Sequence, residues 1–416
     1  MVVKNFNFYF FIFINSILLL AVFHLYKKHL VGNDSSISEW MINYQGGFTR
    51  RGLPGEIAFH IAKTFDLKLR FVIFLFQSFF YSLYLLLIYY FFRNIRINTI
   101  ILFAIFTPIF LIYHIAELEV LARKEIFLFI GYIWFYNISK KENDVKKSIL
   151  WVFFILPIVS VLYEPSIFYY SFFAATIIIK MRNEKITKII LTIILIFIPS
   201  LVVSWFSAFA LITEEGFEIM KNSLSENFGE TCYMSCAYMS SKKETLVHLN
   251  TTINTLTRTE NSLFIYLFRY FMIMLVGCGP LLILIKNSTF NISLFNFKGS
   301  TLPFMILNIM VPIHWLMFVD WGRAVNITYV SSLLFFFYLY KNDLIKINFK
   351  NIQKKLDPLI NFVLEKTFFK SKKFFVTFVF VIYAFGWSPP TLLSADVNSI
   401  PGYRIPYKAI KFLLLR

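Results

Sequence analysis

Two adjacent arginines behind a pair of glycines form the first group of residues that could bind a ligand. The stretch 40–56 reads WMINYQGGFTRRGLPGE, with Gly46 and Gly47 shortly before Arg50 and Arg51. Glycine allows close approach of backbone amides, and guanidinium groups are planar, permanently charged forks that suit phosphate oxygens. The pattern therefore predicts a phosphate or pyrophosphate site. A tight turn whose arginines contact lipid head groups is the alternative.

Three carboxylates elsewhere in the chain are candidates for a general base. Glu164 lies in a short turn, Tyr-Glu-Pro, between two apolar runs. Few water molecules would reach it there, so its pKa is expected to rise toward the working range of a base. Asp320 lies in the turn Asp-Trp-Gly-Arg, and Glu117 lies in the stretch 114–125. In the structural alternatives, Glu164 only marks a helix end and Asp320 only pairs with Arg323.

Further basic residues lie close to the apolar runs. The stretch 114–125 reads HIAELEVLARKE and contains Arg123 and Lys124; if it is helical, Glu119 can pair with Arg123 four positions on. Ionisable groups at membrane depth are costly, so they usually pair or line a polar cavity. The stretch is either part of a site or a self-neutralised cluster that caps two helices. Arg269 lies inside an apolar run, where it serves the site or extends to the membrane surface.

The composition shows which elements must position these residues. The 416 residues are 58% hydrophobic and 15% charged, with 53 Phe, whereas soluble chains carry about 25% charged residues. The apolar residues form blocks near the length that spans a bilayer as a helix. This excludes a soluble enzyme, a disordered chain and, despite the net charge of +18, a nucleic-acid binder.

The expected fold is all-α, a single integral membrane domain over 1–416 built as a polytopic transmembrane bundle. Solidly apolar blocks exclude an outer-membrane barrel, whose strands alternate apolar and polar residues. We expect about eleven spans. They lie near 6–26, 71–92, 97–113, 126–137, 149–162, 166–180, 189–211, 263–285, 301–318, 325–340 and 374–387.

The charges between the spans predict the orientation. Short loops rich in Lys and Arg stay in the cytoplasm. With the amino terminus cytoplasmic, the inner segments carry nearly all of the basic excess, and the outer segments are almost neutral. The first span follows Lys4 without a small-residue cleavage site, so it is expected to be a retained anchor. The protein is then a multi-pass protein of a bacterial inner membrane, and the candidate site residues face the periplasm.

Two long connections have their own character. The stretch 213–261 is a large polar periplasmic loop in which Cys232 and Cys236 could form a local disulfide, and it offers no zinc-site spacing. The stretch 341–373 carries nine Lys among apolar residues. It predicts an amphipathic cytoplasmic helix, broken at Pro358, that lies on anionic lipid head groups. No cytoplasmic segment contains a Gly-rich phosphate loop.

The spans, the single large periplasmic loop and the motifs GGFTRRGLPGE and DWGR together resemble the bacterial O-antigen polymerases of the Wzy type. These are membrane glycosyltransferases of a GT-C-like class. Outer loops of that family often carry an Arg with Gly eleven positions later, whereas here Arg51 is followed by Ala62 and Arg258 by Arg269. Related enzymes place an acidic pair in the first outer loop, and here Glu117 and Glu119 lie in the second.

The resemblance implies a reaction. A polyprenyl-pyrophosphate-linked glycan is transferred to another lipid-linked repeat unit at the periplasmic face. Cations would hold the departing pyrophosphate, a role that falls to Arg50, Arg51 and either Arg123 or Arg323. A carboxylate would accept the proton of the incoming hydroxyl, and the candidates are Glu164, Asp320 and Glu117. The expected partners are this lipid-linked glycan, membrane lipids and, as in the family, a chain-length regulator protein. Neither a metal nor another cofactor is expected.

Two other classes of protein remain as alternatives. A flippase for the lipid-linked oligosaccharide would also need basic residues, but in a central cavity open to both faces. Transporters typically show internal repeats, and the sequence shows none. A membrane scaffold without catalytic activity is the third alternative.

The charge distribution predicts the location of the carboxyl terminus. Alkaline phosphatase fused after Arg416 should be active, because this enzyme folds in the periplasm. The same reporter fused within 341–373 should be inactive. An inactive fusion after Arg416 together with an active fusion within 341–373 would reverse the predicted side of every outer segment.

Overall fold

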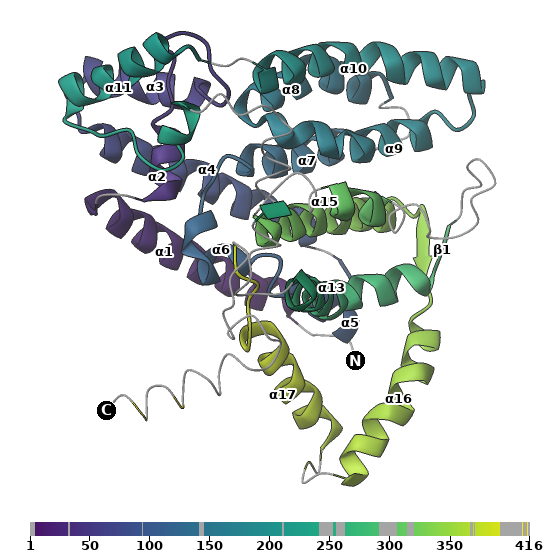
Figure 1. Cartoon of the computed structure of the whole chain (residues 1–416). Helices are drawn as coiled ribbons and strands as arrows, with labels where there is room; N and C mark the ends of the chain where they lie inside the picture. The colour runs from purple at the N-terminus through teal and green to yellow at the C-terminus, as the bar shows by residue number, and fades with distance from the viewer. Residues whose placement is uncertain are drawn as a thin grey trace. The chain divides into compact units, whose positions relative to one another are not determined.

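A computed structural model of the chain is mainly helical, with one two-stranded sheet among the residues it describes (Figure 1). The described residues are 5–31, 34–93, 95–140, 145–209, 212–240, 253–254, 263–290, 306–313, 320–366, 369, 371–391, 410 and 414. The chain divides into two units. Unit 1 comprises Met1–Phe6, Ile95–Glu117 and Thr245–Arg416, and unit 2 comprises Asn7–Asn94 and Leu118–Glu244.

Five of the described helices are long and apolar enough to cross a membrane. They are α1 (Phe6–Leu30), α4 (Leu69–Phe92), α8 (Val145–Leu162), α10 (Ile186–Phe209) and the Leu267–Lys286 part of α13 (Leu263–Lys286). At about 1.5 Å per residue, lengths of 18–25 residues match a hydrocarbon layer of about 30 Å. The chain is therefore an all-α protein with helices of membrane-spanning length, and the count of eleven spans stays a prediction.

In unit 2, aromatic side chains join α1 to α4 in antiparallel fashion. Phe10 lies 6.2 Å from Tyr89 near one end of the pair, and Tyr26 lies 5.8 Å from Phe74 near the other, between ring centres. Helix α7 (Ile126–Ile138) contacts α4 and α8, and α8 packs along α10 (Figure 1). The 3₁₀ helix η3 (Glu164–Tyr169) and α9 (Tyr170–Lys180) connect these two helices and contact both.

The outer face of α10 fits a lipid environment. Eleven large apolar side chains along it are 44–65% exposed, which is an unfavourable surface in water. They are Ile186, Ile190, Leu191, Ile194, Leu195, Ile198, Leu201, Val202, Trp205, Phe206 and Phe209.

Short helices form the part of unit 2 beyond its apolar helices. The first predicted outer loop contains α2 (Ser35–Trp40) and α3 (Leu53–Thr64), and the large loop contains α11 (Glu214–Phe228) and the 3₁₀ helix η4 (Ala237–Ser240). Side chains of the N-cap residues Asp34 and Thr213 accept hydrogen bonds from the first turns of α2 and α11. Phe59 of α3 meets Phe228 of α11 at 5.1 Å between ring centres.

Unit 1 contains the helices α5 (Thr99–Ile105), α6 (Tyr113–Ala116), α13, α15 (Trp321–Lys341), α16 (Phe349–Lys366) and α17 (Lys372–Phe385). Strand β1 (Ser288–Phe290) pairs antiparallel with β2 (Ile345–Ile347), with Thr289 opposite Lys346. This sheet joins the ends of α13 and α15. Asn326 of α15 donates to the Ile109 carbonyl at 2.9 Å, which attaches α15 to the segment after α5.

Segments predicted on the same side of the membrane contact one another within each unit. In unit 2, Arg51, Glu164 and Lys124 bring the first three outer segments together. In unit 1, the sheet joins two predicted cytoplasmic segments, and Thr391 contacts Glu117 between two predicted outer ones. These contacts agree with the predicted order of sides. Which end faces the periplasm stays a prediction from the charges.

Two predicted spans contain shorter α-helices than expected. The stretch 97–113 contains only the seven-residue α5 before a turn, and 166–180 contains the 11-residue α9 after η3. Helices α7 and α17, with 13 and 14 residues, match the short spans predicted at 126–137 and 374–387. Of the predicted span 301–318, the structure describes only 306–313, and these residues are helical. The rest of this span lies outside the described residues. The predicted break at Pro358 is wrong, because α16 continues through it. A proline inside a helix bends it without ending it when the lost hydrogen bond is met elsewhere.

Helix α16 provides a test of the predicted lipid contact. Figure 1 shows α16 leaving the sheet steeply inclined to α15. Leu359 is 61% exposed, and Lys354 is exposed on the opposite side of the helix. In protein reconstituted into anionic vesicles with Cys278 replaced by Ser, a spin label at Leu359→Cys should collide with lipid-dissolved oxygen. A label at Lys354→Cys should collide with an aqueous nickel complex. Equal aqueous access at both positions would contradict lipid contact.

Candidate functional site

Arg51 lies between two carboxylates from distant parts of unit 2. Its Nε and Nη2 donate to the Glu164 carboxylate at 2.7–2.9 Å, and its Nη1 donates to Glu39 Oε1 at 2.9 Å. The Arg51 guanidinium also lies 5.5 Å from the centre of the Tyr163 ring. Glu39 belongs to α2, Glu164 begins η3, and Arg51 precedes α3. Three short elements are therefore joined by one guanidinium.

The Glu164 carboxyl differs from the sequence prediction. Burial alone would raise its pKa, but the Arg51 guanidinium outweighs burial and the pKa lies below its ordinary value. The positive charge of Arg50 adds to this lowering of the Glu164 pKa. The predicted rise in pKa is wrong because the stabilising cation comes from 113 residues away in the sequence. Glu164 is an ion-paired carboxylate in this structure.

Lys124 supports the same cluster from a third segment. Its side chain is fully buried, and its Nζ donates to the backbone carbonyls of Glu39 at 2.7 Å and Arg51 at 2.5 Å. Burial lowers the pKa of Lys124 to about 7, with a further lowering from Arg51 and an opposing effect of Glu39. Lys124 therefore binds the backbone of both Glu39 and Arg51, the two residues that form one of the ion pairs of the cluster.

Two residues near Lys124, one in the segment of Arg51 and one just before the lysine itself, have an unusual backbone conformation. Arg51 and Ala122 have φ angles of 60° and 53°, in the left-handed region that costs a non-glycine residue about 1 kcal/mol or more. Each carbonyl accepts a buried side chain, Lys124 Nζ on Arg51 and Trp40 Nε1 on Ala122. These contacts help to stabilise the turns that present Arg51 and Lys124.

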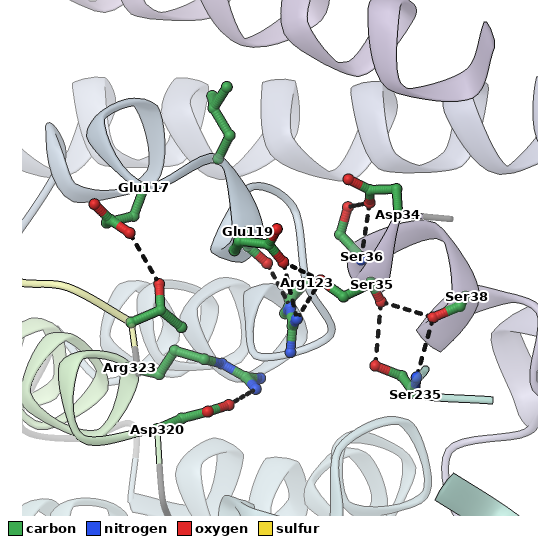
Figure 2. Close-up of polar contacts among 12 residues, drawn as sticks. Asp34, Ser35, Ser36, Ser38, Glu117, Glu119, Arg123, Ser235, Asp320 and Arg323 are labelled. Atoms are coloured by element: carbon green, nitrogen blue, oxygen red, sulfur yellow. Dashed lines mark hydrogen bonds and ion pairs between the residues drawn. The ribbon is translucent and has the colours of Figure 1, made fainter. Parts of the chain in front are cut away.

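The disulfide loop of the segment 213–261 holds α2 from its other side. Cys232 and Cys236 are bonded, and the loop between them presents Tyr233 and Ser235 to α2. The backbone N–H of Ser235 donates to Ser38 Oγ, and its hydroxyl donates to the Ser35 carbonyl (Figure 2). Arg70 binds Glu230 at 2.7 Å beside this loop. Helix α2, which carries Glu39, is thus fixed on both sides.

Arg123 belongs to a neighbouring network in unit 2. Figure 2 shows it between Glu119 and Ser35, with Nε on the Glu119 carbonyl at 2.6 Å and Nη2 on Ser35 Oγ at 2.8 Å. The predicted Glu119–Arg123 pair is present at 4.0 Å. The connecting segment is not an α-helix, because η1 (Leu118–Val120) is a single 3₁₀ turn.

The structure explains why the two positions before the arginines, 46 and 47, are glycines. A Cβ on Gly46 would lie 1.7 Å from the Gly216 carbonyl oxygen, and one on Gly216 would lie 2.3 Å from the Gly46 oxygen. Gly47 has a φ of 109°, which L side chains rarely adopt. Gly46 is therefore required by contact with α11, which is a different reason from the predicted approach of a ligand.

The remaining predicted site residues lie in unit 1. Arg323 donates to Asp320 at 2.9 Å, so these two form the pair that the sequence offered as the structural alternative (Figure 2). Glu117 accepts a hydrogen bond from Thr391 Oγ1 at 3.3 Å. Arg269 lies in α13 and is half-buried. Unit 1 thus holds its own set of two carboxylates and two arginines.

Glu39 is the residue of the cluster that sequence reasoning missed. It lies in a short polar helix with no apolar periodicity, SSISEW, where nothing distinguishes a buried carboxylate from an exposed one. Its side chain is 2% exposed. Among the residues that the structure describes, no group of three or more His, Cys, Asp or Glu side chains could hold a metal ion.

The lowered pKa of Lys124 predicts how stability depends on pH. The folded protein releases this proton near pH 7, whereas the unfolded chain keeps it until about pH 10.5. Between these values only the unfolded state binds the proton, so the free energy of unfolding should rise by up to about 1.4 kcal/mol per pH unit. Lys124→Met should lack this contribution. The measurement is the melting temperature of both proteins in detergent at several pH values between 7 and 9.5. If the melting temperatures of the two proteins change with pH by the same slope, Lys124 stays charged in the folded protein.

Comparisons with protein-family models, with curated proteins and with solved structures find no match to this chain.

Proposed function

We propose that this protein is a membrane glycosyltransferase that polymerises repeat units of a surface polysaccharide. In this proposal a glycan linked to polyprenyl pyrophosphate is the donor, and the hydroxyl of another lipid-linked repeat unit is the acceptor. The reaction takes place on the periplasmic side of a bacterial inner membrane. The proposal agrees with the resemblance of the chain to the O-antigen polymerases.

The observation that supports it most is the buried cluster of Arg51, Lys124, Glu39 and Glu164. Ionisable groups close to apolar membrane helices are costly, and they most often mark a pathway or a site. The four residues come from three separate connections, so the fold of unit 2 gathers them at one place. The cluster combines the two kinds of group that the reaction needs, a cation for a leaving pyrophosphate and a carboxylate for a hydroxyl proton.

The proposed step assigns a role to each group. Glu164 accepts the proton of the acceptor hydroxyl, and the electron pair of that oxygen forms the new bond to the anomeric carbon of the donor. The bond from that carbon to the pyrophosphate oxygen breaks, and its electron pair stays on the pyrophosphate. Arg51, with Arg50 beside it, stabilises the charge that develops there. Lys124 and Arg123 keep the supporting backbone in place through their carbonyl and hydroxyl contacts.

The other two candidate bases, Asp320 and Glu117, lie in unit 1. Asp320 lies next to Arg323, and Glu117 lies on the segment that Thr391 contacts. A carboxylate paired with an arginine is the same combination as in unit 2. Asp320 is therefore the variant to compare with Glu164.

Glutamine at position 164 tests the proposed base. Glu164→Gln keeps the size of the side chain but removes its basic lone pair, so chain extension should fall by roughly 10²–10⁴-fold. The measurement is the polysaccharide ladder of a deletion strain that carries the variant, with the amount of protein measured in the same membranes. Glu218→Gln is the matched control, because Glu218 is an exposed carboxylate of unit 2 that pairs with Lys221.

The other outcomes are distinct. Normal extension by Glu164→Gln with loss in Asp320→Asn would move the base to unit 1. Normal ladders from both variants at normal protein level would exclude both carboxylates as the base and leave Glu117 as the remaining candidate. A deletion strain that lacks even single repeats at its surface would indicate a flippase.

A further inference from the structure

The two carboxylates on Arg51 are held very differently. Glu164 binds two guanidinium nitrogens, and Glu39 binds the third. The Glu39 side chain is 2% exposed, the Glu164 side chain 10% and the Arg51 side chain 19%. The part of the cluster that a solute can reach is therefore the Arg51–Glu164 pair, and Glu39 lies behind it.

Glu39 is also part of the better fixed element. Its backbone carbonyl accepts Lys124 Nζ, and the next residue, Trp40, donates from its indole to the Ala122 carbonyl at 3.1 Å. Asp34 caps the helix, and Ser235 bonds to Ser38 from the disulfide loop. Glu164, by contrast, starts a 3₁₀ helix without a side-chain cap. If Arg51 exchanges one partner, Glu164 is the partner with more freedom to leave.

We propose that the donor pyrophosphate replaces Glu164 on the Arg51 guanidinium while Glu39 keeps Arg51 in position. This inference rests on the proposed function. A phosphate group offers the same two-oxygen edge to a guanidinium as a carboxylate does, with more negative charge. The exchange therefore preserves the paired hydrogen bonds of Arg51, and it makes Glu39 a positioning residue that sequence reasoning did not identify.

The exchange would couple the two halves of the reaction. While Arg51 is bound to Glu164, it keeps the pKa of that carboxyl low, which makes Glu164 a weak base. Once released and close to a new anion, Glu164 gains affinity for a proton. The acceptor hydroxyl would then be deprotonated only when a donor is present, and the proton lost by the hydroxyl is the one that Glu164 gains.

Binding of inorganic pyrophosphate tests the exchange directly. Full-length protein in lipid nanodiscs is titrated with pyrophosphate by calorimetry at fixed salt and neutral pH. Glu164→Gln removes the negative charge that competes with pyrophosphate for Arg51, so affinity should rise roughly tenfold or more. Glu39→Gln also removes a negative charge but weakens the support of Arg51, so it should not tighten binding. Glu218→Gln should leave the affinity unchanged.

A double-mutant cycle connects the effect to the guanidinium. Arg51→Lys keeps the charge but loses the fork, so Glu164→Gln should no longer tighten binding in that background. Melting curves establish that each variant is folded, and if Glu39→Gln is not, Glu39→Asp, which should also fail to tighten binding, takes its place. Equal tightening by the Glu39 and Glu164 variants would overturn the assignment of Glu39, and unchanged affinity in Glu164→Gln would overturn the exchange.

These results separate the two proposals. If neither the wild-type protein nor Glu164→Gln binds pyrophosphate, the proposed donor is wrong and the exchange is wrong with it. If pyrophosphate binds and Glu164→Gln abolishes chain extension, but its affinity is that of the wild type, the proposed function stands and only the exchange is rejected.

Discussion

The pairing of Arg51 with Glu39 and Glu164 is the interaction on which the organisation of unit 2 depends. A guanidinium cannot be removed from water without negative partners, and here the partners come from segments before and far after it in the sequence. Leaving a fully buried ion without its partner costs about 3–5 kcal/mol, and somewhat less here because Arg51 keeps 19% exposure. The helix α2, the turn before α3 and the 3₁₀ helix after α8 can therefore reach their places only together.

The same requirement explains why the connections of unit 2 are folded elements. Long loops beside a membrane have many backbone groups to satisfy, and caps, short helices and lysine contacts meet that need. Lys124 serves two carbonyls at once, one of them on a residue with left-handed backbone. The disulfide loop adds a second support for α2. An arrangement with this many mutual supports is suited to holding charged groups in fixed geometry.

Sequence reasoning succeeded where a single strong signal was present. The apolar run predicted at 71–92 is α4 at Leu69–Phe92, and 189–211 corresponds to α10, because burial in lipid requires continuous apolar residues. It failed for Glu164, whose isolation in the sequence suggested a raised pKa, because the pairing with Arg51 arises only from the tertiary fold. It missed Glu39 because exposed and buried carboxylates look alike in a short polar helix. Lys124 and Glu164 were predicted as site residues because charged residues next to apolar runs are conspicuous, and Arg51 because a pair of arginines follows a pair of glycines.

The contact between Gly46 and Gly216 has a consequence for the ancestry of this protein. Two backbones touch where each glycine lies. A side chain at either position would collide with the backbone of the other segment, and no substitution at the other position removes that backbone. Both glycines should therefore be kept during evolution. Distant relatives whose sequences have otherwise diverged should therefore retain this separated pair of glycines together, one before the arginine pair and one at the start of a polar helix. That signature would recognise relatives by a steric constraint where overall similarity no longer does.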